Sequence, residues 1–360
     1  MSENLNDRGR ALKSTSRLFA LLCLLCAVAI AGQRQAAAQG QPPPAPAPQA
    51  PATDTVAPDI PGVVKGGTKV EVVKQGFRAT DGPVPLPDGS LIFWNFPDKT
   101  IVKIDKDGNA STFLTQGVGV GRNGAQAMTF DSKGRLITLD KDKTSTRIAV
   151  VHPPGSERVL VSTCEGKPMP EANDLIADKK GGVYFSDQDG FVFYGRPDGT
   201  CVKVQTETDR LNGIILSRDE KTLYVTTQGR MPREALTDGD LKTDGGNTLL
   251  AYDIQADGTL RNRRVFATYA FINRRPEGLP DQRFGGDGIT IDSEERIYAA
   301  TAAGIQVFDQ QGKLLGTIPT ARNPQNLAFA GPEKKTLYVT ARGAILKIEM
   351  LSQGFKGRPK

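Results

Sequence analysis

The chain has 360 residues, with 46 Lys and Arg against 40 Asp and Glu, and a formal net charge of +6. The basic residues are scattered through turns rather than gathered in runs, so the charge pattern argues against a nucleic-acid-binding protein. Because the chain has a single histidine, a zinc site built from a cluster of nitrogen and sulfur ligands is disfavoured.

The first 38 residues are typical of a secretory signal segment. A basic start is followed by the apolar run LFALLCLLCAVAIAG at residues 18–32. A run of this length fits the roughly 7–15 residues of a secretory core better than the ~20 of a membrane-spanning helix. Small-residue cleavage sites follow Ala31 and Ala38. We expect a periplasmic or secreted protein without a membrane attachment; an uncleaved anchor is the alternative.

Residues 39–61 contain PPPAPAPQAPAT and have the composition of an extended, solvated linker. Residues 62–360 remain for a folded domain, which is long enough to bury one large core. Removal of residues 1–38 leaves 41 basic and 38 acidic residues, a net charge of +3. This milder charge again gives no reason to expect a nucleic-acid partner.

Six stretches of this domain repeat one pattern: a polar residue, two to four apolar positions, a turn rich in Asp, Gly or Lys, and a second apolar run. The distances between successive leading residues are 45, 47, 39, 75 and 39 residues, and most match the ~40–50 residues of a four-stranded propeller blade. Alternating segments between the copies predict further hairpins, and helix signals are almost absent. We therefore predict an all-β, six-bladed β-propeller. The leading residues are Asp81, Gln126, Asn173, Asn212, Asp287 and Asn326.

Two features complete this topology. The run KVEVVKQGF at residues 69–77 has no hairpin of its own, and AILKIEML at residues 344–351 needs a strand partner. Pairing of the two would close the ring by strand exchange between the N- and C-terminal strands and remove exposed sheet edges. The interval of 75 residues contains an irregular stretch, 228–248, which we predict to be a long loop over the mouth of the central site.

Radial stacking of blades would bring the leading residues together around a common axis. A ring of carboxylate and amide oxygens suits a hard cation such as Ca²⁺. One such residue alone would more often cap a turn through its own backbone. Several in register favour a cation site.

The segments TDGPVPLPDGSLIFW from Thr80, LNGIILSRDEKTLYV from Leu211 and GGDGITIDSEERIYAA from Gly285 resemble the regucalcin/gluconolactonase (SMP-30/gluconolactonase/LRE-like) family of six-bladed propellers. The resemblance extends from about Gly76 to the C-terminus. It implies a divalent cation, usually calcium, and hydrolysis of a lactone or related ester. Mg²⁺, Mn²⁺ or Zn²⁺ are alternatives to Ca²⁺. The metal ligands that it implies are Asp81, Asn173, Asn212 and Asp287.

The resemblance also assigns Asp287 as the catalytic carboxylate that takes a proton from the attacking water. Asp81 departs from the family, which has a longer Glu at that position. Residues expected at the substrate are Gln126, Glu171, Asn326 and Trp94. Glu171 would repel anionic sugar acids, whereas Trp94 would either line the mouth or pack in the core.

A noncatalytic propeller with a structural axial calcium, which binds a ligand or partner on one face, is the alternative function. Cys164 and Cys201 remain after signal removal, and whether they form a disulfide is left open by the sequence. The oligomeric state is likewise left open.

Overall fold

The computed structural model describes residues 51–96, 98–115, 125–141, 146–205, 210–230, 247–270 and 283–357. The chain divides into two compact units, Met1–Ala50 and Pro51–Lys360, and all described residues belong to the second. The expected signal segment and most of the expected loop at 228–248 therefore lie outside the described residues. Every regular element in the described part is a β-strand, and no described segment is a helix suited to crossing a membrane.

The strands form five large sheets and one small hairpin. Three sheets have four strands in chain order: β3 (Thr80–Pro85), β4 (Leu91–Asn95), β5 (Thr100–Ile104) and β6 (Ala110–Leu114); β7 (Ala125–Phe130), β8 (Leu136–Lys141), β9 (Thr146–His152) and β10 (Arg158–Val161); β13 (Ala172–Ala177), β14 (Val183–Asp187), β15 (Val192–Gly195) and β16 (Cys201–Lys203). An eight-stranded sheet contains β17 (Leu211–Leu216), β18 (Thr222–Arg230), β19 (Thr248–Ile254), β20 (Leu260–Thr268), β21 (Arg283–Ile291), β22 (Ile297–Thr301), β23 (Gly304–Phe308) and β24 (Leu314–Ile318). A five-stranded sheet has the order β1 (Thr55–Val56), β2 (Lys69–Gln75), β27 (Ala344–Glu349), β26 (Thr336–Ala341) and β25 (Asn326–Ala330), and β11 (Thr163–Cys164) pairs with β12 (Lys167–Pro168).

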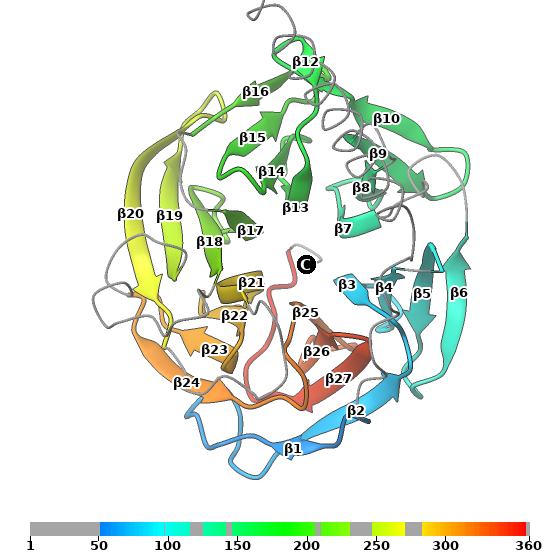
Figure 1. Ribbon diagram of the computed structural model, residues 1–360, viewed down its shortest axis with the longest axis vertical. Helices are drawn as coiled ribbons and strands as arrows, with labels where there is room; N and C mark the ends of the chain where they lie inside the picture. Colours follow the sequence, from blue (N-terminus) through cyan, green and yellow to red (C-terminus); the bar gives the residue numbers. More distant parts are fainter. Residues whose placement is uncertain are drawn as a thin grey trace, which may run out of the picture. The chain divides into compact units, whose positions relative to one another are not determined.

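Within the unit Pro51–Lys360 the sheets surround a common centre in a propeller-like arrangement (Figure 1). Strands β3, β7, β13, β17, β21 and β25 lie innermost, and each contains one leading residue of the sequence repeat. The repeat therefore marks the strands that face the centre.

Apolar side chains between neighbouring sheets hold the ring together. One cluster joins Val84 and Trp94 of the first sheet to Met128 of the second, and all three are fully buried. Burial of apolar side chains where neighbouring sheets face each other is the main stabilising contribution.

The N-terminal segment packs against the C-terminal sheet. Strand β2 pairs antiparallel with β27, with Val70 opposite Ile348. The packed unit begins at Pro51, so it includes residues 51–61, which the composition predicts to be a solvated linker. Ala57 and Ile60 are buried in the apolar cluster that also contains Phe329. Their burial shows that these residues are part of the packed domain, although they follow a Pro/Ala run typical of a linker.

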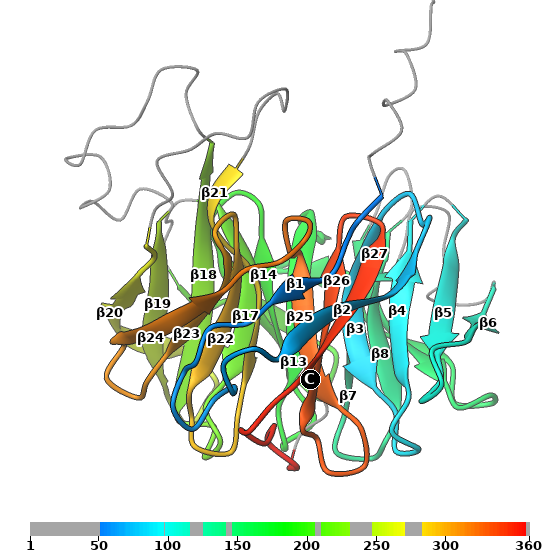
Figure 2. The same ribbon diagram turned by 90° about the horizontal axis from the view of Figure 1, so that it is seen from below.

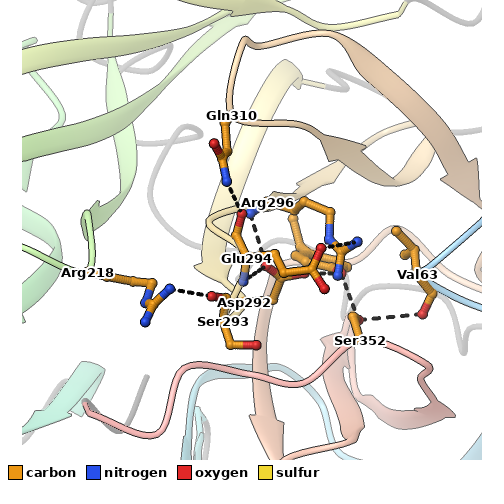
Figure 3. A network of polar contacts seen from close by, with 9 residues as sticks. Val63, Arg218, Asp292, Ser293, Glu294, Arg296, Gln310 and Ser352 are labelled. Carbon is orange, nitrogen blue, oxygen red and sulfur yellow. Dashed lines mark hydrogen bonds and ion pairs between the residues drawn. The ribbon is translucent and has the colours of Figure 1, made fainter.

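A polar network secures the face away from the tips of β18 and β21 (Figures 2 and 3). Asp292, fully buried, accepts a hydrogen bond from Arg296 Nε at 2.6 Å. The Tyr298 hydroxyl bridges Asp292 Oδ2 at 2.9 Å and Ser352 Oγ at 2.8 Å, and Ser352 Oγ reaches the carbonyl of Val63 at 3.5 Å. Burial raises the pKa of Tyr298, which keeps its hydroxyl protonated. The turn before β22 is thus joined to both ends of the described chain.

Cys164 and Cys201 form a disulfide that links β11 to β16, with a Cα–Cα distance of 4.5 Å. The sequence could not decide this pairing because it depends on how the segment between the two cysteines folds back. The bond closes a loop whose ends are 37 residues apart in the chain.

The double substitution Cys164→Ser with Cys201→Ser should lower the free energy of unfolding by about 2–4 kcal/mol, because the unfolded chain gains the entropy that the cross-link removes. Urea unfolding followed by circular dichroism measures the change. Reduction of the wild type with dithiothreitol should reproduce it. Identical unfolding midpoints for oxidised wild type and the double variant would contradict a stabilising bond.

Candidate functional site

Five of the six innermost strands carry one extra residue relative to their partner strand. On β17, Leu211 pairs with Thr227 of β18 and Ile214 pairs with Val225. The two pairs are three residues apart on β17 but only two residues apart on β18. The same shift occurs in β3, β7, β13 and β21. Such a β-bulge bends the strand and changes the direction of a side chain, and bulges are common beside binding sites. Each shift lies at or next to a leading residue: Asp81, Gln126, Asn173, Asn212 and Asp287.

Strand β25 lacks this feature. Asn326 pairs with Thr340 and Leu327 with Val339 in unbroken register. The Asn326 side chain accepts a hydrogen bond from the N–H of Leu327 and packs over Gly288 of β21, where an added Cβ would lie 2.1 Å from Asn326 Cγ. The side chain of the sixth leading residue therefore packs between β25 and β21 and does not line the cavity described below.

The residue after a leading residue makes the contact to the next inner strand. A Cβ at Gly213 would lie 2.4 Å from the carbonyl oxygen of Asp287, and one at Gly82 would lie 2.7 Å from that of Gln126. Only glycine allows backbones to approach so closely. The Asn-Gly and Asp-Gly pairs of the sequence are thus explained by crowding near the centre.

Five leading residues line one cavity of about 400 Å³. They come from five inner strands that are far apart in the chain. The lining residues are Asp81, Gln126, Asn173, Gln188, Arg210, Asn212, Gln228, Gly285, Asp287, Ala300, Thr301, Ala302, Asn323, Pro324, Gln325 and Arg342.

The oxygen-bearing side chains of this cavity are held by local hydrogen bonds. Asp81 Oδ1 accepts from the N–H of Gly82 at 2.7 Å, which fixes its carboxylate beside its own backbone. Asn212 Nδ2 donates to Gln228 Oε1 at 3.4 Å, so the carbonyl oxygen is the end of this amide that suits a cation. Asp81, Asn173 and Asn212 are at most 8 % exposed, and Asp287 is half-buried.

This donor set fits a hard divalent cation. Two carboxylates and two amides would supply oxygen ligands, and the two negative charges would balance the ion. Among the described residues, no group of three or more His, Cys, Asp or Glu side chains is arranged to hold a metal ion. Nitrogen- or sulfur-binding metals are correspondingly disfavoured.

Gln126 lines the cavity as expected, but three other residues expected at the substrate do not. Trp94 is fully buried between sheets and packs in the core, the other outcome considered for it. The side chain of Asn326 packs between β21 and β25, as described above. Glu171 is exposed, because the N–H of Ala172 bonds to the carbonyl of Pro170 at 2.8 Å and this tight turn carries Glu171 outward.

Sequence reasoning missed two arginines in the cavity wall, Arg210 and Arg342. Arg210 precedes Asn212 by two residues, as Glu171 precedes Asn173. Arg342 directly follows strand β26, which contains the second apolar run of its copy. Both positions recur in the repeat, and that periodicity is the signal that could have identified them.

Asp187 directly precedes Gln188, a residue of the cavity wall. Burial raises the pKa of the Asp187 carboxyl group, although hydrogen bonds from backbone N–H groups oppose the shift.

The family model described as the SMP-30/Gluconolactonase/LRE-like region matches residues 79–343. A gluconolactonase of Zymomonas mobilis subsp. mobilis is 24 % identical over 330 residues, covering 83 % of this chain and 86 % of that protein. The pentonolactonase XacC of Haloferax volcanii is 28 % identical over 295 residues, covering 77 % and 86 %.

Among solved structures, a calcium-binding protein, regucalcin, from Agrobacterium tumefaciens superposes with a TM-score of 0.58 at 16 % identity. The match covers 80 % of this chain and 96 % of that one. At this identity the likeness establishes a shared fold.

Gly213→Ala should disturb the cavity, because the new methyl group meets the backbone at Asp287. We expect a loss of about 1–3 kcal/mol in unfolding free energy together with weaker binding of the cation that we propose below, for which Ca²⁺ is the probe. The matched control is Gly134→Ala, in the β7–β8 turn: its φ is +72° and no atom lies within 4 Å of the added Cβ. That control should lose about 1 kcal/mol with unchanged Ca²⁺ affinity. Denaturant unfolding and calorimetric titration measure both effects, and equal Ca²⁺ affinity in the two variants would refute the coupling.

Proposed function

Because the chain belongs to the SMP-30/gluconolactonase/LRE-like family, we propose that it is an exported, divalent-metal-dependent hydrolase of a lactone or related ester. The names of its relatives, gluconolactonase and pentonolactonase, support the reaction class. The name of the structural neighbour supports calcium as the ion. The observation that carries the proposal is that Asp81, Asn173, Asn212 and Asp287 line one cavity.

In this proposal those four residues hold the cation through their side-chain oxygens. When bound, the ion supplies Lewis acidity that polarises the substrate carbonyl and stabilises negative charge on its oxygen. Asp81 and Asn212 are oriented for this task by Gly82 and Gln228. Gln126 lies in the wall, where its amide can bind substrate hydroxyl groups.

Asp287 has the catalytic role. Its carboxylate takes a proton from a water molecule, whose oxygen forms a bond to the acyl carbon. The acyl–oxygen bond of the ring then breaks, and the released alkoxide receives the proton. One water is consumed, and the product is a hydroxy acid. The backbone of Asp287 is held for this step by Thr226, whose hydroxyl donates to its carbonyl at 2.8 Å.

For the architecture we propose six blades. The eight-stranded sheet is then two blades, β17–β20 and β21–β24, which among the described residues pair where Gln228, Gly229 and Arg230 of β18 meet Gly285, Phe284 and Arg283 of β21. The β2–β27 pairing then closes the ring by strand exchange. In this arrangement the bound cation would connect four blades at the axis.

For the location we propose the periplasm or the extracellular space. The apolar run at residues 18–32 and the cleavage sites after it support export. The Cys164–Cys201 disulfide supports it independently, since such bonds persist mainly in oxidising compartments.

Asp287→Asn should remove hydrolysis of glucono- and pentonolactones in the presence of Ca²⁺ while the protein stays folded, because an amide cannot take the proton. The matched control is Asp309→Asn in the same sheet, where the carboxylate caps a turn through the N–H groups of Gln311 and Lys313. This control should stay active, and EDTA should inactivate both the control and the wild type. Lactone turnover followed by pH-stat and folding followed by circular dichroism provide the measurements.

A wild type that binds Ca²⁺ but hydrolyses no lactone or ester would overturn the catalytic role. That result would favour the noncatalytic propeller with a structural ion instead.

A further inference from the structure

The cavity is not symmetric about the centre. Its wall at β21, β22 and the turn after β22 includes the small residues Gly285, Ala300 and Ala302, with Thr301 between the two alanines. Strand β21 lies between β17 and β25 in the ring (Figure 1). Small side chains leave room there for part of a ligand that extends away from the residues proposed to bind the ion.

Two arginines flank this space. Arg210 immediately precedes β17, on one side of β21, and Arg342 lies in the β26–β27 turn, on the other side. Their guanidinium groups have a planar array of donors that matches a carboxylate or a phosphate group.

A glutamine in the cavity wall holds each arginine in place. Gln228 accepts a hydrogen bond from Arg210 Nε at 3.3 Å and donates its backbone N–H to the Arg210 carbonyl at 2.8 Å. Gln325 Oε1 accepts from the backbone N–H of Arg342 at 2.9 Å. The bonds that place Arg342 use its backbone, and its carbonyl also accepts from Arg322 Nη1 at 3.0 Å. Both residues are thus positioned parts of the wall.

The charges in the described lining point to an anionic ligand. The charged lining residues are Asp81 and Asp287, with a total of −2, and Arg210 and Arg342, with a total of +2. A bound dication would raise the sum from 0 to +2. A neutral lactone would leave this excess uncompensated in a partly enclosed site, whereas an anionic substituent would offset it.

We propose that the substrate is a lactone or ester that carries an anionic substituent, a carboxylate or a phosphate, bound between Arg210 and Arg342 beside β21. This inference deepens the hydrolase function proposed above and rests on it. Glu171, which would repel such substrates, is exposed and does not line this cavity.

The test compares three probes. D-Glucono-1,4-lactone is neutral, D-glucaro-1,4-lactone differs from it by a free carboxylate at C6, and 6-phosphogluconolactone carries a phosphate. With Ca²⁺ present, the wild type should prefer at least one anionic probe in kcat/KM, and that probe identifies the group. Arg210→Ala and Arg342→Ala should each lower kcat/KM for that probe roughly tenfold or more, and lower it less for the neutral lactone.

The Lys variants at both positions should recover part of the loss, because they keep the charge but not the planar donor array. The control is Arg158→Ala at an exposed position of β10, which removes the same charge outside the cavity and should leave all three rates unchanged. A binding readout independent of turnover is calorimetric titration with glucarate and gluconate. Wild type should bind glucarate more tightly, and the Ala variants should lose that difference.

Salt provides a second check. Raising the ionic strength from about 0.01 to about 0.1 M shortens the screening length from about 30 to about 10 Å, so the preference for the anionic probe should decrease.

Equal losses on neutral and anionic probes would overturn the proposal, since the arginines would then act on the reacting carboxyl group. No preference in the wild type would overturn it as well. Failure of the proposed function has a different signature: none of the three probes would be hydrolysed, with or without Ca²⁺.

Discussion

The structure depends on the crowding of backbones at the centre of the ring. Neighbouring inner strands approach so closely that Gly82 and Gly213 have no room for a side chain beside the backbones of Gln126 and Asp287. Gly288 has none beside the side chain of Asn326. Close approach alone would leave side chains alternating regularly along each strand. The extra residue in five of these strands interrupts the alternation next to the crowded positions. The two features together bring polar side chains from distant parts of the chain into one cavity.

The sixth inner strand shows what the bulge contributes. Strand β25 has a leading asparagine in the same position of the repeat, but its ladder is regular, and the side chain of Asn326 packs against Gly288 instead of lining the cavity. The residue type alone therefore does not determine the role. The wall of this sector is completed by Gln325 and Arg342, and the substituent site that we propose lies beside it.

Much of the fold and part of the site could be predicted from the sequence, because both follow from a repeat. The spacing of the leading residues located the inner strands, and the residue types Asp, Asn and Gln indicated the chemistry of the cavity. What failed depended on local backbone geometry that the pattern does not encode. Glu171 and Arg210 occupy the same position relative to their leading residues, yet a tight turn carries Glu171 outward, whereas the carbonyl of Arg210 continues the pairing with β18. The sequence also could not predict two tertiary features, because both depend on contacts between distant segments. These are the burial of Ala57 and Ile60 and the disulfide between Cys164 and Cys201.

The central claim is that Asp81, Asn173, Asn212 and Asp287 bind one divalent cation. Crystals grown with CaCl₂ and then soaked in a lanthanide salt would test it by anomalous diffraction, since lanthanides replace calcium at oxygen sites. The account predicts one strong anomalous peak within the cavity, from an ion that the side-chain oxygens of these four residues coordinate. A cavity without a peak, or a peak held by other residues while these four contact only protein atoms, would contradict it.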